Sequence, residues 1–329
     1  FLLLTNFIKF CKITKKYKVM KIHQKLKIIQ KATGKTQSQI AQEIGVSFAT
    51  FNSWINQKSN PRIKMQNKIN EMYLEVTGQK IIPDEIINAK KELLKIKSLK
   101  YKNLIGMIIK NPDIQNEIIL KLTYHTNKIE GSTLSEAETA SIIFDNVSIP
   151  NKTLIEQLEA KNHQTAVIKM FDFISQNKKI DENFILKIHS ILMNGIISNA
   201  GSYRNHTVRI VGANVPTANY ISIPNLMSKL ITKINLKDKD IISLSSRVHS
   251  EFEQIHPFSD GNGRTGRILL SAILLKENYA PAIIKQEEKQ LYYTYLNKSQ
   301  VKNDYTQLED LICESIFLGF DIIERKTRQ

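Results

Sequence analysis

The chain has 329 residues, a formal net charge of +16, and 42% hydrophobic and 24% charged residues. These proportions are typical of a folded globular protein and exclude a disordered, collagen-like or low-complexity chain. The only cysteines are Cys11 and Cys313, which excludes a disulfide scaffold and favours a reducing, cytoplasmic setting. No apolar run approaches the roughly 20 residues that a membrane helix needs, so we expect no membrane span.

Positive charge is concentrated in the N-terminal third of the chain. Residues 1–110 contain 22 Lys and Arg against 6 Asp and Glu, whereas residues 111–329 contain 25 of each. This asymmetry indicates a basic binding module followed by a neutral one. Arginine follows a different distribution, because five of the eight lie in one window: Arg204, Arg209, Arg247, Arg264 and Arg267. Since a planar guanidinium suits phosphate, this window predicts phosphate chemistry.

Residues 20–78 are predicted to form a helix-turn-helix domain, after a tail over 1–19 to which we assign no role. The alternation of lysines with apolar residues over 21–33 predicts an amphipathic helix that ends at Gly34. Thr36 can cap a second helix over 37–44, and Ser47 can cap a third after a turn at Gly45.

The stretch 37–47 resembles the Cro-type phage-repressor family of DNA-binding domains. The resemblance implies that the third helix enters the major groove of DNA. Asn52 is the first candidate to read a base, since a side-chain amide can bind adenine edges. The set of candidate DNA-contacting residues is Ser47, Thr50, Asn52 and Ser53. The alternative is a plain three-helix bundle that contacts another protein.

The remaining pattern is helical with one exception. Residues 79–120 are predicted to be a linker of two helices, with a break at Asn111 and a solvated lysine-rich face over 90–102. The stretch 207–211 alternates apolar and polar residues, which predicts a strand of a β-hairpin. The further helices are expected at 154–174, 184–193, 221–234, 244–255, 264–276 and 305–323. The expected fold class is therefore mainly α, a helical bundle with a small β-hairpin flap plus the N-terminal domain.

The segment 256–267 carries the chemistry and reads His-Pro-Phe-Ser-Asp-Gly-Asn-Gly-Arg-Thr-Gly-Arg. Its glycines at 261 and 263 precede a helix, and backbone N–H groups at such a start form an anion site. Asp260 would repel a phosphate there unless Mg²⁺ lies between them. Arg264 and Arg267 are three residues apart, so both can reach one phosphate chain. His256 can accept a proton near neutral pH. The group predicts phosphoryl or nucleotidyl transfer.

This segment matches the motif of the Fic (Fido) family at every specified position, and the resemblance covers roughly 121–329 as a catalytic domain. It implies a Fic-type helical bundle that transfers AMP from ATP to a Ser, Thr or Tyr hydroxyl of a target protein, with Mg²⁺. His256 would be the general base and Asp260 the magnesium ligand. The strand near 208–214 would be the flap that aligns the target. The implied nucleotide-binding residues are Val211, Gly212, Ala213, Asn214, Asp260, Gly261, Asn262, Gly263, Arg264, Thr265, Gly266, Arg267, Tyr292 and Gln300.

Residues 126–131 resemble the inhibitory helix motif of the same family, in a helix expected near 121–131. The resemblance implies that Glu130 pairs with Arg267 and keeps it from the γ-phosphate of ATP. In some relatives the same glutamate serves removal of AMP, so net removal stays an alternative. A DNA-binding regulator whose Fic domain only senses ATP is another. The donor could also be another nucleotide or a phosphocholine donor, and the oligomeric state stays open, with a homodimer as one alternative.

Overall fold

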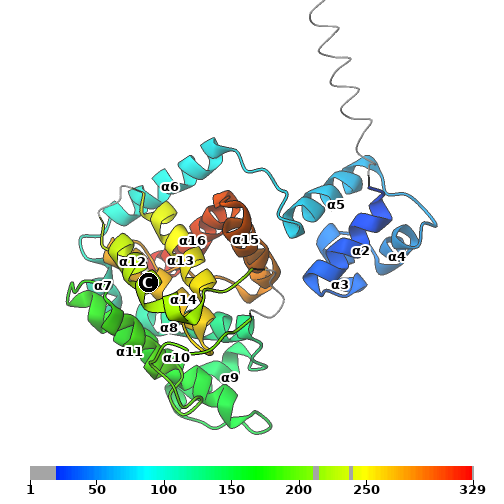
Figure 1. The fold of residues 1–329 in the computed structure, drawn as a ribbon. Helices are drawn as coiled ribbons and strands as arrows, with labels where there is room; N and C mark the ends of the chain where they lie inside the picture. Colours follow the sequence, from blue (N-terminus) through cyan, green and yellow to red (C-terminus); the bar gives the residue numbers. More distant parts are fainter. Residues whose placement is uncertain (1–19, 210–214, 237–239, 328–329) are drawn as a thin grey trace, which may run out of the picture. The chain divides into compact units, whose positions relative to one another are not determined.

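The computed structural model describes residues 20–209, 215–236 and 240–327 (Figure 1). The chain divides into two compact units, Phe1–Lys80 and Ile81–Gln329. The described helices are α-helical apart from a π-helical turn over Ser141–Asp145 and 3₁₀ turns over Tyr220–Ser222 and Gln286–Glu288. Among the described residues, none of the helices is both long enough and apolar enough to cross a membrane.

The first unit is a bundle of four described helices: α2 (Ile22–Thr33), α3 (Gln37–Ile44), α4 (Phe48–Ile55) and α5 (Ile63–Val76). Both expected caps are present, since the Thr36 hydroxyl accepts from Gln39 N and the Ser47 hydroxyl accepts from Thr50 N. Gly45 has a φ of 85°, which permits the tight turn between α3 and α4. Helix α2 packs against α4 and α5 through buried apolar side chains such as Leu26. Helix α5 closes this core and was not predicted.

The second unit is a larger helical bundle. Its α-helices are α6 (Asp84–Leu99), α7 (Leu104–Lys110), α8 (Pro112–Glu130), α9 (Glu136–Ala140), α10 (Leu154–Ser175), α11 (Glu182–Leu192), α12 (Ile223–Ile234), α13 (Ile241–Ile255), α14 (Asn262–Lys276), α15 (Lys289–Lys302) and α16 (Thr306–Thr327). Helix α14 is central, because all its residues from Ile268 to Leu275 are buried, all but Ser271 are apolar, and it packs against α8, α10, α11 and α13. The mainly α fold class is confirmed.

The predicted β-hairpin is not found in the described part of the chain. Residues 207–209 are not in a strand, and 210–214 lie outside the described residues. The described contact near this segment is a bond from the Thr217 hydroxyl to the Val208 carbonyl, at 2.8 Å. Side-chain bonding of this kind does not build the backbone ladder that a strand pair needs.

The lysine-rich face of α6 is not simply solvated. Lys90 pairs with Asp310 at 2.5 Å, Lys91 with Glu309 at 2.5 Å, and Lys97 with Glu324 at 2.7 Å, so α6 is tied to α16. The expected break at Asn111 is present between α7 and α8, and a further break lies between α6 and α7. Because α6 and α7 pack within the second unit, residues 84–110 form part of that bundle.

Candidate active site

The loop between α13 and α14 is closed by one buried amide. The Oδ1 atom of Asn262 accepts from Phe258 N, and its Nδ2 atom donates to the Phe258 carbonyl, both at 2.9 Å. Gly261 has a φ of 76° directly before α14, a conformation that favours glycine. Asn262 was predicted to bind the nucleotide, but both polar atoms of its side chain are already hydrogen-bonded to the backbone of the loop. The first backbone N–H groups of α14 have no partner within the helix, as at any helix start.

His256 lies at the mouth of this loop in a left-handed conformation, with a φ of 52°. Its Nδ1 atom donates to the Glu253 carbonyl at 3.2 Å, which leaves Nε2 as the nitrogen that can take a proton. Burial lowers the pKa of His256 below its usual value, so the imidazole is neutral at pH 7. The ring is therefore in the neutral form that a general base requires, with Nε2 available to accept a proton.

Arg204 holds the end of α13 through hydrogen bonds to the backbone. Its guanidinium is buried and donates to backbone carbonyls instead of a phosphate. The acceptors are His256 (2.7 Å), His206 (2.6 Å), Ala218 (2.6 Å) and Ile255 (3.3 Å). Burial lowers the pKa of Arg204. The arginine-rich window predicted phosphate chemistry, and for Arg204 this prediction was wrong. The N–H groups of its guanidinium are hydrogen-bonded to backbone carbonyls near His256.

Arg204→Leu is expected to lower the free energy of unfolding of the second unit by about 3 kcal/mol or more, since buried carbonyls would lose their donor. Urea denaturation at pH 7 measures this change. Arg247→Leu is the matched control, because Arg247 is exposed and, within the part of the chain that the structure describes, stacks on the Tyr305 ring at 5.4 Å. Equal losses in the two variants would contradict the role of Arg204.

His189 of α11 also holds the loop between α13 and α14, and no motif in the sequence pointed to it. Its ring stacks on Phe258 with centroids 3.7 Å apart. Nε2 donates to the Asp260 carbonyl at 3.0 Å, and Nδ1 accepts from Gly201 N at 2.9 Å. Burial lowers the pKa of His189 to about 4, so the ring stays neutral and keeps this pattern of donor and acceptor. Together with Arg204, it fixes the loop backbone.

The two arginines of α14 each have a carboxylate partner. Arg267 donates from Nη2 to Glu130 Oε1 at 2.5 Å and from Nε to the Thr126 hydroxyl at 2.9 Å. Arg264 donates from Nη1 to Glu159 Oε1 at 2.6 Å, and its Nη2 lies 3.6 Å from Asp260 Oδ1. Both guanidinium groups are buried, whereas 59% of the Asp260 side chain is exposed. The start of α14 therefore combines two buried guanidinium groups with the solvent-exposed carboxylate of Asp260.

Glu130 reaches this place because α8 ends there. Gly131 follows it with a φ of 109°, which stops the helix and leaves Glu130 as its last residue. Burial raises the pKa of Glu130, but Arg267 outweighs burial and holds the pKa below its usual value. A Cβ atom built on Gly263 would lie 2.5 Å from Glu130 Oε1. Only glycine at 263 therefore leaves room for this ion pair.

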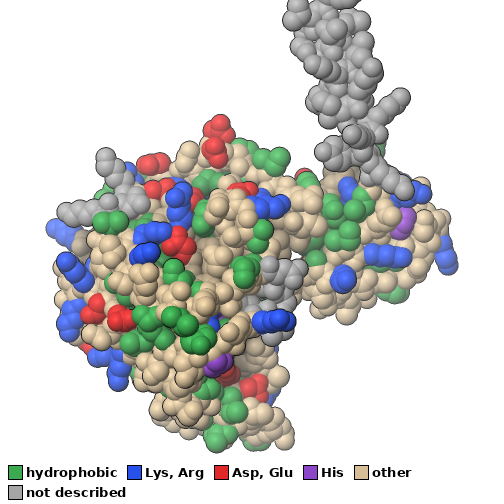
Figure 2. Space-filling view, viewed as in Figure 1, with side chains coloured by type: hydrophobic (Ala, Val, Ile, Leu, Met, Phe, Trp, Pro, Cys, Tyr) green, Lys and Arg blue, Asp and Glu red, His purple; other side chains and the backbone are tan. Residues whose placement is uncertain are grey.

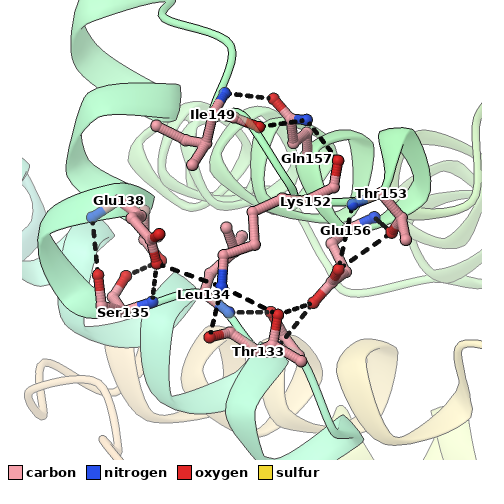
Figure 3. A network of polar contacts seen from close by, with 11 residues as sticks. Thr133, Leu134, Ser135, Glu138, Ile149, Lys152, Thr153, Glu156 and Gln157 are labelled. Carbon is pink, nitrogen blue, oxygen red and sulfur yellow. Dashed lines mark hydrogen bonds and ion pairs between the residues drawn. The ribbon is translucent and has the colours of Figure 1, made fainter.

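A polar network fixes the segment that follows Glu130 (Figure 3). The Glu156 carboxylate at the start of α10 accepts from Thr133 N at 2.7 Å and from the Thr133 hydroxyl at 2.8 Å. Lys152 donates to the Thr133 carbonyl at 3.2 Å. Hydrogen bonds, above all the one from Thr133 N, lower the pKa of Glu156 to about 2. The carboxylate therefore stays charged over the whole neutral range, and the end of α8 is held to α10.

The other described residues of the predicted set lie in α14 and α15. Tyr292 is fully buried, and its hydroxyl donates to His249 Nε2 at 2.8 Å. Gln300 donates to the Ser250 carbonyl at 3.1 Å, and the buried Thr265 hydroxyl donates to the Gly261 carbonyl at 2.9 Å. Gly266 leaves room for Glu253, whose Oε1 would clash with an added Cβ. The predicted residues Val211, Gly212, Ala213 and Asn214 lie outside the described residues.

The fold is that of known Fic-domain structures. Fic-1 from C. elegans has a TM-score of 0.62 at 19% identity, covering 93% of this chain and 98% of that one. A Fic family protein from Desulfovibrio desulfuricans G20 has a TM-score of 0.61 at 22% identity, covering 76% and 77%.

Residues 179–274 match the Fic/DOC family, which confirms the expected Fic domain over this range. The protein adenylyltransferase Fic of Nematostella vectensis is 32% identical over 185 residues, 54% of this chain and 42% of the relative. That of Aedes aegypti is 30% identical over 195 residues, 58% and 38%. The matched part of the chain thus spans about two fifths of the length of these curated relatives.

Proposed function

We propose that the second unit transfers AMP from ATP to a Ser, Thr or Tyr hydroxyl of a target protein. The observation that carries the proposal is the convergence of His256, Asp260 and two buried arginines on the start of α14. A neutral base beside an anion site is what attack by an alcohol on a phosphate ester requires. The similarity to relatives named protein adenylyltransferase Fic supports the same reaction.

Asp260 fits a magnesium ion that is shared with a nucleotide. Its carboxylate is exposed, and among the described residues its contacts are to Oδ1, from Gly261 N at 2.6 Å and from the more distant Arg264. The described residues contain no cluster of three or more His, Cys, Asp or Glu that could hold a metal ion. One carboxylate plus substrate phosphates is the usual manner in which Mg²⁺ is bound. Magnesium, when bound, would offset the charge of the phosphates.

The chain's own residues then act as follows. His256 Nε2 takes the proton of the target hydroxyl while the oxygen bonds to the α-phosphorus. The bond between the α-phosphorus and the bridging oxygen breaks, and pyrophosphate leaves. The first N–H groups of α14 bind the α-phosphate oxygens, and the two arginines bind the leaving pyrophosphate. Arg204 and His189 hold the loop so that His256 stays in place.

In this proposal Glu130 makes the resting protein autoinhibited. An arginine held by a carboxylate at 2.5 Å is not available for a γ-phosphate, and Glu130 itself adds a negative charge where the phosphates would lie. The network around Thr133 and Glu156 keeps α8 in this position. Removal of AMP from a modified target is the alternative use of Glu130.

Labelling with ATP tests the proposal directly. The Glu130→Gly variant, which lacks the proposed inhibition, is incubated with cell lysate, Mg²⁺ and ATP labelled at either the α- or the γ-phosphate, and the label found in lysate without the variant is subtracted. We expect protein-bound label from the α position only, since a kinase would transfer the γ label, and we expect EDTA to prevent labelling. Label from the γ position would contradict AMP transfer.

A second proposed function is DNA binding by the first unit. Between residues 20 and 80 it has 10 Lys and Arg against 3 Asp and Glu, and basic side chains dominate the charged groups on the face seen in Figure 2. Helices α3 and α4 pack as a pair around the Gly45 turn. Asn52 is half-buried and donates to Gln37 Oε1 at 3.1 Å, so base reading would have to exchange this bond.

Fluorescence anisotropy with labelled duplex DNA tests this second function. We expect affinity to fall by roughly 100-fold between 50 and 200 mM salt, as for about four phosphate contacts. Lys58→Glu on the first unit should weaken binding, while His256→Ala in the other unit is the control that should leave it unchanged. Binding that is absent, or that does not depend on salt, would contradict the proposal.

A further inference from the structure

Arg264 lies between two carboxylates of different character. It is 2.6 Å from Glu159 and 3.6 Å from Asp260, and its side chain is only 4% exposed. The Glu159 side chain is 18% exposed, whereas that of Asp260 is 59% exposed. The Nε atom of Arg264 has no hydrogen-bond partner among the described residues. Glu159 is therefore the main counter-ion of a buried guanidinium.

Glu159 is presented by a helix that is fixed along its length. Helix α10 packs against α8, α11 and α14. One turn before Glu159, Glu156 is bonded to Thr133, and one turn after it, Asn162 donates to the carbonyls of Leu192 and Asn194 at 3.2 and 2.8 Å. Since α10 cannot readily shift, Glu159 holds Arg264 at a defined place beside Asp260.

Glu159 and Glu130 occupy different positions relative to the anion site. The atom that a Cβ on Gly263 would meet first is Glu130 Oε1, and its next neighbours belong to Arg267. Glu159 is not among these neighbours. Glu130 thus lies over the first turn of α14, while Glu159 approaches Arg264 from α10. Glu159 can therefore remain bound to Arg264 while phosphates occupy the place over α14 where Glu130 lies.

We propose that Glu159 is a positioning residue that holds Arg264 back from Asp260 and so keeps the Asp260 carboxylate available for magnesium. The inference rests on the proposed function, in which Asp260 binds the ion. A buried guanidinium without a counter-ion is costly, so it would take the next carboxylate within reach. That carboxylate is Asp260, four residues earlier in the sequence, whose Oδ1 already lies 3.6 Å from Arg264 Nη2, so a small shift of Arg264 would shorten this ion pair to a direct hydrogen bond. An arginine bonded to Asp260 would then compete with the ion.

Calorimetric titration of the full chain with ADP, with and without Mg²⁺, tests the proposal without any turnover. All variants carry Glu130→Gly, so that Arg267 is released from its carboxylate partner in each. The measured quantity is the factor by which Mg²⁺ tightens ADP binding. We expect Glu159→Gln to reduce this factor by roughly 10-fold or more, the usual effect of losing a residue that supports a metal ligand. ADP binding without Mg²⁺ should change much less.

Three further variants make the result specific. Asp260→Ala should abolish the effect of Mg²⁺; if it does not, the proposed metal site fails and the inference with it. Asp172→Asn lies on the same helix but pairs with Lys169 at the surface, at 2.9 Å, so the factor should stay at the parent value. Glu159→Asp keeps the charge with a shorter reach and should restore part of the effect. It also carries the test if Glu159→Gln does not fold.

Two outcomes would overturn the inference while the proposed function stands. One is a Glu159→Gln variant that keeps the full effect of Mg²⁺ while Asp260→Ala loses it. The other comes from the chain that retains Glu130. If Glu159→Gln raises AMP transfer there, Glu159 is a second inhibitory carboxylate instead of a positioning residue.

Discussion

Glu130→Gly is expected to raise AMP transfer to a target by a factor on the order of 10 to 100, the range typical of coupling between a regulatory contact and a site. Glu130 holds Arg267 at 2.5 Å, and Arg267 is buried enough that water does not screen the pair. Without the glutamate, Arg267 can bind the phosphate chain and the negative charge over α14 is gone. The initial rate of label transfer from α-labelled ATP measures the change.

A second variant reaches the same state by a different route. Gly263→Ala would put a methyl group 2.5 Å from Glu130 Oε1 and so force the carboxylate away. We expect it to raise transfer as well, though less, because the methyl group also lies beside the phosphate site. Glu117→Gln is the matched control, since Glu117 is on α8 but pairs with Arg325, at 3.1 Å. Equal labelling by the parent chain and by Glu130→Gly would contradict autoinhibition by this residue.

His256→Ala is expected to lower transfer by roughly 100- to 10,000-fold in the Glu130→Gly background, the range for loss of a general base. The pH dependence follows from burial, which lowers the pKa of His256. Because the neutral ring is the active form, transfer should rise with pH and level off, with a midpoint below the ordinary histidine value of about 6.5. Initial rates between pH 5 and pH 8 measure this profile.

The control for this prediction is His23→Ala. His23 is in α2 of the first unit, so its loss should leave both the rate and the pH profile unchanged. An His256→Ala variant that transfers AMP at the parent rate would rule out His256 as the base. A midpoint well above 6.5 would instead mean that another group takes the proton.

The helices of the site could be predicted because their signals are local. The motif at 256–267 contains its own helix end, its glycines and the start of α14, all within twelve residues. Thr36 and Ser47 cap the helices that the sequence assigned to them. Short-range rules of capping and spacing were therefore enough to place His256, Asp260 and the arginines around one loop.

Elements whose signal was ambiguous were predicted less well. The alternation over 207–211 is not accompanied by a strand at 207–209, since a pleated segment needs a partner strand to hold its backbone groups. The lysines of α6 were predicted to be solvated, but α16 supplies acidic partners more than two hundred residues away. Neither outcome is encoded in the neighbouring residues.

The sequence by itself determined the chemical groups of the site and their order along one loop, because that geometry depends on residues a few positions apart. Only the tertiary structure decided what each group bonds to. Glu159 meets Arg264, His189 meets the Asp260 carbonyl, and Arg204 spends its donors on the backbone at His256. The physical reason is that α14 is buried on all sides. Its burial brings α10, α11 and the segment that follows α11 close to the start of α14. A buried charge there must take whichever partner the packing supplies.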